Sequence, residues 1–162
     1  MITPIALLRF SKSIFFVCGI WLIGLGGYFM FVRPALLPED LRYLGGSANQ
    51  LETLLPHLAS WLRHVFTVMG GFMAGCGVLL LFVSVRAVRQ CVAGTGTAIG
   101  LAGLLTVATM SWTNFVLDSD FQWVLLVPAV AWLLGFVIYV VGKRAEHATV
   151  TVPQTNKRAP CE

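Results

Sequence analysis

The sequence predicts an all-α membrane protein: a four-helix transmembrane bundle with a helical loop between its first two spans. Its 162 residues are 57% hydrophobic and only 11% charged, whereas soluble domains average about 25% charged residues. The hydrophobic residues gather in four long runs, and a helix needs about 20 such residues to cross a bilayer core. Charged residues bound each run. The length suits one compact unit.

The predicted spans cover residues 14–32, 65–85, 92–116 and 123–141, within one transmembrane domain of residues 1–144. Arg9 and Lys12 precede the first run, as in a signal peptide. However, this run exceeds the roughly 7–15 apolar residues of a signal peptide, and no A-x-A site closes it. We therefore expect a retained span. Residues 145–162 are polar and are predicted to form a mobile cytoplasmic tail.

The basic residues predict the orientation. With a cytoplasmic N-terminus, three of the eleven lie outside (Arg33, Arg42 and Arg63), and eight lie inside: Arg9, Lys12, Arg86, Arg89, Lys143, Arg144, Lys157 and Arg158. Cytoplasmic loops carry the excess of Lys and Arg. We therefore expect both termini in the cytoplasm, loop 33–64 outside, and a multi-pass protein of the bacterial inner (cytoplasmic) membrane. This bias accounts for the net charge of +4 without a nucleic-acid partner.

The loop of residues 33–64 opens with RPALLPEDLRYLGG. Pro38 and the acids after it are typical of a helix N-terminus, and Gly45 is typical of a helix end. Ser47 and Gln50 match a capping box that would open a second short helix. An apolar stripe is predicted along Leu51, Leu54, Leu55, Leu58 and Leu62, interrupted by Pro56. The loop either covers the mouth of the bundle or forms a lid over a cavity.

Small residues at four-residue spacing predict where helices approach closely in lipid. The second span carries Gly71 and Gly75 in GFMAG, and the third carries Gly96 and Gly100 in GTAIG. These pairs fit packing within the bundle, and they also fit the contact face of a homodimer. The spacing alone leaves both alternatives open.

No predicted span has an ionisable residue near its middle, which argues against proton-coupled transporters and ion channels that depend on one. The four cysteines are not paired as CxxC, so neither a zinc site nor a thiol-oxidase pair is expected. We expect no catalytic residue, metal or cofactor. Candidate ligand-binding residues gather instead at the predicted outer rim: Arg33, His57, Arg63, His64, Trp112, Asn114 and Asp118.

These rim residues allow several interpretations. They could anchor the protein at the interface, with Asp118 or Asp120 paired to Arg33 or Arg63. His57 and His64, seven residues apart and on roughly the same helix face, could form a metal site with an acid, or a general acid/base site.

The order of features resembles uncharacterised bacterial small four-helix membrane proteins, broadly the DoxX-like group. The first span ends in RPALLPED; a YLG turn, a P-x-L-x-x-W segment and the glycine-rich HVFTVMGGFMAGCGVLL follow. The resemblance covers roughly residues 14–141 and implies a four-helix bundle. Members of the group have been linked to redox or respiratory complexes, and most have no assigned activity. The resemblance assigns no functional residue.

Three functions follow from these patterns. The first is an accessory or interaction subunit that contacts membrane lipid and another membrane protein or a second copy of the chain. The alternative is a binder or carrier of a lipid, quinone or other apolar ligand in a cavity beneath loop 33–64. The least expected is a membrane enzyme using His57, Arg63, His64, Asn114 and Asp118.

Overall fold

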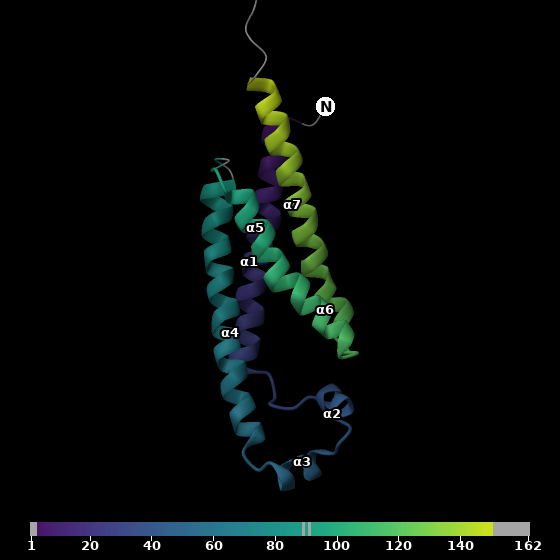
Figure 1. Ribbon diagram of the computed structural model, residues 1–162. Helices are drawn as coiled ribbons and strands as arrows, with labels where there is room; N and C mark the ends of the chain where they lie inside the picture. The colour runs from purple at the N-terminus through teal and green to yellow at the C-terminus, as the bar shows by residue number, and fades with distance from the viewer. Residues whose placement is uncertain (1–2, 89, 91, 151–162) are drawn as a thin grey trace, which may run out of the picture.

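The computed structural model describes residues 3–88, 90 and 92–150. In this part of the chain the all-α prediction is confirmed, and four helical stretches are long and apolar enough to cross a membrane. The elements, in chain order, are α1 (Pro4–Phe31), α2 (Pro38–Leu44), α3 (Ala48–Leu54), α4 (Leu58–Val83), the π-helical turn η1 (Ser84–Val88), α5 (Thr95–Gly103), the π-helical turn η2 (Leu104–Ala108), α6 (Thr109–Val116) and α7 (Gln122–Val150) (Figure 1).

The helices extend beyond the apolar runs that predicted them. α1 begins at Pro4 rather than at residue 14, because the Thr3 hydroxyl caps it by accepting a hydrogen bond from the Ala6 N–H at 3.4 Å. α7 continues to Val150, so residues 145–150 belong to this helix and not to the predicted tail. Hydropathy marks only the part of a helix that suits lipid, whereas its backbone hydrogen bonds continue into water. The rest of the predicted tail, residues 151–162, lies outside the described residues.

The spans are arranged around α1, which lies between α4 and α7 (Figure 1). The third span, formed by α5, η2 and α6, packs along α7. α2 and α3 lie at the same end of the molecule as residues 117–121, and we call this the loop end. The start of α1 and the end of α7 lie toward the opposite end (Figure 1). Large apolar side chains such as Phe72, Leu105 and Leu133 point outward, as expected for lipid contact.

Glycines set the close contact between α1 and α4. A Cβ on Gly26 would lie 2.7 Å from the Ala74 nitrogen, and a Cβ on Gly77 would lie 2.7 Å from the Gly19 oxygen. Only residues without a side chain allow the two backbones to approach this closely. Gly71 and Gly75, which the spacing selected, point away from α1, and a Cβ there would meet nothing within 4 Å. Of the two alternatives left open for these glycines, packing within the bundle does not hold for Gly71 and Gly75.

The third span meets α7 through small residues opposite aromatic ones. Gly96 lies against Tyr139 and Gly100 against Phe136, so the predicted pair does face another helix of the chain. Two side chains also donate hydrogen bonds between the spans: Trp132 Nε1 to the Ile99 carbonyl at 3.1 Å and Ser111 Oγ to the Leu125 carbonyl at 2.9 Å. These bonds fix the rotation of the third span about its axis.

Candidate ligand site at the loop end

α2 forms where the sequence places it. The Leu37 N–H, just before the helix, donates to Asp40 Oδ2 at 2.8 Å, and Gly45 ends the helix with a left-handed backbone at φ 67°. α3 opens with the predicted capping box, in which the Ser47 N–H donates to Gln50 Oε1 at 3.0 Å and the Gln50 N–H to Ser47 Oγ at 3.3 Å. Both predicted short helices are confirmed.

The predicted leucine stripe is not continuous. α3 ends at Leu54, and Leu55 leaves the helical conformation at φ −138° and ψ 72° before α4 starts at Leu58. The conformation of Leu55 fits the restriction that Pro56 places on the residue before it. Leu54 and Leu55 are largely exposed, whereas Leu51, Leu58 and Leu62 are partly buried.

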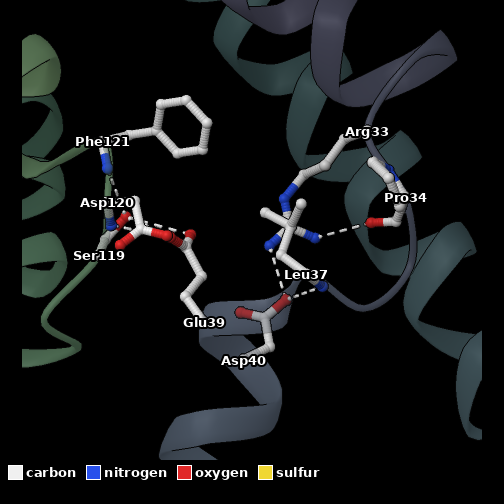
Figure 2. Close-up of polar contacts among 8 residues, drawn as sticks. All are labelled: Arg33, Pro34, Leu37, Glu39, Asp40, Ser119, Asp120 and Phe121. Carbon is white, nitrogen blue, oxygen red and sulfur yellow. Dashed lines mark hydrogen bonds and ion pairs between the residues drawn. The ribbon is translucent and has the colours of Figure 1, made fainter.

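Glu39 fastens α2 to the connection between α6 and α7 (Figure 2). Its carboxylate accepts hydrogen bonds from Ser119 Oγ at 3.1 Å and from the Asp120 N–H at 2.9 Å. Ser119 is buried, and its Oγ in turn accepts from the Phe121 N–H at 3.2 Å. Bonds to a carboxylate are stronger than neutral ones, so Glu39 is the main attachment between these segments.

Arg33 fastens the other side of α2 to the spans. Its guanidinium pairs with Asp40 at 3.2 Å, as Figure 2 shows. The guanidinium also lies over the ring of Phe66, 3.7 Å from its centroid, and within 5.4 Å of Phe29. Such stacking is favourable for a cation on an aromatic face. The Arg33 side chain is only 10% exposed, and its contacts connect α1, α2 and α4.

A third contact is an exposed ion pair. Arg42 Nη2 lies 3.0 Å from Asp120 Oδ1, and both side chains are more than half exposed. The hydrogen bond that Arg42 donates to Asp120, together with the charge of this carboxylate, raises the pKa of Arg42 above its ordinary value. Exposed pairs of this kind contribute little to stability. The pair therefore helps to orient α2 but contributes little to the free energy of its attachment.

The loop that receives Glu39 is shaped by Asp118, which has a left-handed backbone at φ 48°. The Ser119 N–H donates to the Asn114 carbonyl at 3.0 Å and the Asp118 N–H to the Phe115 carbonyl at 3.2 Å. This pattern ends a helix in a tight turn, usually with glycine at the left-handed position. The turn presents the Ser119 hydroxyl and the Asp120 N–H to Glu39.

An apolar hollow of about 200 Å³ lies beneath α2. Tyr43 and Leu44 line it from α2, Leu62 and Phe66 from α4, and Leu117 from the end of α6. Its polar lining comes from Glu39 and Asp40, whose carboxylates are committed to Ser119 and Arg33. We call this space the α2 hollow. Most of the side chains that line it are apolar.

A larger hollow of about 450 Å³ lies on the other side of Arg33. It is bounded by residues 29–35, where α1 ends, and by Ala59, Ser60 and Arg63 in the first turns of α4. We call it the arginine hollow, because the charged residues among its described lining are Arg33 and Arg63.

Of the predicted rim residues, Arg33 and Arg63 line the same hollow, and none of the others lines it with them. His57, Arg63, His64, Trp112 and Asp118 are exposed, and the Asn114 side chain donates to the Met110 carbonyl of its own helix at 2.9 Å. Within the described residues no three His, Cys, Asp or Glu side chains are grouped to hold a metal ion. The ion pairs also differ from those anticipated: Arg33 pairs with Asp40, and Asp120 with Arg42. Helix α2, whose position the sequence did not give, supplies both new partners.

The residues that build the site and were not selected from the sequence are Glu39, Asp40, Phe66 and Ser119, whereas Asp120 was predicted to pair with a different arginine. The sequence predicts that the acids of α2 stabilise its N-terminus, and Asp40 does so while also pairing with Arg33. No sequence pattern relates Ser119 to Glu39, because they lie 80 residues apart.

Comparisons of the chain with protein-family models, with curated proteins and with solved structures found no match.

Proposed function

We propose that the protein is a multi-pass membrane protein that binds an apolar chain of a membrane constituent, such as a lipid or a quinone, in the α2 hollow. The observation that carries this proposal is the double attachment of α2 above an apolar space. A helix held by Arg33 on one side and by Glu39 on the other is built to stay over that space. The volume of about 200 Å³ suits part of an acyl or isoprenoid chain better than a whole drug-sized ligand, which fills roughly 300–1,000 Å³.

The proposal extends to the membrane and the orientation. The charge bias supports the cytoplasmic membrane, with both termini in the cytoplasm and the loop end outside. In a variant without native cysteines, an impermeant thiol reagent added outside is expected to label Ala48→Cys and not Arg86→Cys. Labelling of the second variant alone would contradict this orientation.

The binding proposal is tested by filling the hollow. Leu117→Trp enlarges a side chain that lines the α2 hollow, and Val116→Trp places the same group on the neighbouring, outward-facing residue. The full chain and both variants are purified in mild detergent, and co-purifying small molecules are identified by mass spectrometry. We expect an apolar molecule with the wild type and Val116→Trp, and its loss from Leu117→Trp. Equal recovery from all three proteins would contradict the proposal.

A second candidate function is that of an accessory or interaction subunit. The observation that favours it is the face of α4 around Gly71 and Gly75, which no other helix of the described chain covers. Small residues on a lipid-facing helix permit the close approach of a helix from another membrane protein or a second copy. The resemblance to the DoxX-like group stays a prediction and is compatible with either function.

A further inference from the structure

We propose that the arginine hollow binds the anionic, phosphate-type headgroup of a membrane lipid. The inference goes beyond the proposed function: it concerns the opposite side of Arg33 and stands whether or not the α2 hollow holds an apolar chain.

The position of the arginine hollow fits a headgroup. Phe31 and Val32, which line it, end the apolar run of α1 and are 78% and 67% exposed. Arg33 follows directly, so apolar and charged lining meet at the level where a span leaves the lipid. A lipid phosphate lies at this level, and its acyl chains would continue along the exposed apolar surface below. The volume of about 450 Å³ can hold a headgroup.

The charge of the hollow favours an anion. Arg63 is exposed and forms no ion pair with any described residue. Arg33 is partly neutralised by Asp40, which approaches it from the α2 side. No acidic residue is among the described residues that line this hollow. The uncompensated positive charge therefore belongs to Arg63.

The donors around Arg63 suit phosphate oxygens. A guanidinium offers several N–H groups in one plane and binds phosphate through two of them. Ser60, one turn earlier on α4, also lines the hollow and adds a hydroxyl. The N–H groups of Ala59 and Ser60 lie in the first turn of α4, where a helix supplies no acceptor for them. Together these groups surround one anionic group more closely than a single exposed arginine could.

The test measures lipid retention by the full-length protein. Wild-type protein is exchanged into detergent containing equal amounts of phosphatidylglycerol, which is anionic, and phosphatidylcholine, which is neutral overall. Native mass spectrometry then counts the bound lipids. We expect preferential retention of phosphatidylglycerol and a reduction of about tenfold in Arg63→Gln, the size expected for a charge-assisted hydrogen bond. Arg63→Lys, which keeps the charge, is expected to recover part of the preference.

Arg42→Gln is the matched control. It removes the same charge at the same end of the molecule, but Arg42 lines neither hollow and is already paired with Asp120, so retention should fall much less than in Arg63→Gln. Equal retention of the two lipids by the wild type, or unchanged retention in Arg63→Gln, would overturn the proposal. The result of Leu117→Trp is read separately, so the two proposals can fail independently.

A soluble anion is distinguished by a second measurement. Inorganic phosphate is added to delipidated protein at constant ionic strength, and the thermal unfolding midpoint is recorded. No phosphate-dependent shift, with phosphatidylglycerol retained, supports the lipid headgroup. A midpoint raised by phosphate in the wild type but not in Arg63→Gln, without lipid retention, would overturn the assignment to a lipid in favour of a free anion.

Discussion

The carboxylate of Glu39 accepts a hydrogen bond from the buried hydroxyl of Ser119, 80 residues later in the chain, at 3.1 Å. This contact, with the adjacent bond from the Asp120 N–H at 2.9 Å, holds α2 against the connection between α6 and α7. Arg33 supplies the opposing attachment through Asp40 and Phe66. Helix α2 is therefore attached on two sides, to the connection between α6 and α7 and to the end of α1.

Removing the Glu39 carboxylate should release α2. In Glu39→Ala the donors of Ser119 and Asp120 lose their acceptor, at a cost of about 1.5–3 kcal/mol. We expect faster amide hydrogen exchange across residues 38–44, with the exchange of α1 and α4 unchanged. Glu52→Ala, at an exposed acid of α3, is the control and should leave α2 protected. Unchanged exchange in Glu39→Ala would mean that the contacts of Arg33 alone hold α2 in place.

The contact between α1 and α4 should be sensitive to a single methyl group. A Cβ at Gly26 meets the backbone of α4, 2.7 Å from the Ala74 nitrogen, and backbone atoms cannot move aside. Gly26→Ala is expected to destabilise the protein by about 1–3 kcal/mol, the usual cost of overpacking. Gly27→Ala, where a Cβ meets nothing within 4 Å, should be neutral or slightly stabilising because alanine favours a helix. Thermal unfolding in detergent measures both, and equal midpoints would contradict the observed helix contact.

The left-handed backbone of Asp118 should limit which residue types this position tolerates. A β-branched residue fits φ 48° poorly, and the left-handed conformation costs L-residues roughly 1–2 kcal/mol. We therefore expect Asp118→Val to lower the unfolding midpoint and to loosen α2, since this turn presents Ser119 to Glu39. Asp118→Gly should keep or raise the midpoint. The reverse order of the two variants would show that the Asp118 side chain matters more than its backbone.

The uncovered face of α4 gives a test of the second candidate function. A Cβ at Gly75 meets nothing within 4 Å, so Gly75→Leu places a bulky side chain on this open face. If another helix packs there, cross-linking to a partner or to a second copy in native membranes should fall severalfold. Gly24→Leu, at an equally open position on α1, should leave cross-linking unchanged. Identical cross-linking in both variants would remove the observation that favours an interaction subunit.

The sequence by itself determined the four spans and the two short helices of the loop, because these depend on local properties. The length of an apolar run sets a span, and residues such as Pro38, Gly45, Ser47 and Gln50 define helix ends through bonds to their near neighbours. Such signals need no knowledge of the rest of the chain.

Only the tertiary structure decided which side of each helix meets another. Adjacent residues on a helix point about 100° apart, so choosing Gly77 over Gly71 and Gly75 requires the rotation of α4 against α1. In lipid every face of a span is apolar, and hydrophobicity therefore cannot select that rotation. The pairing of Glu39 with Ser119, and of Arg33 with Asp40, likewise depends on where α2 docks, which close packing and hydrogen bonding between distant segments determine.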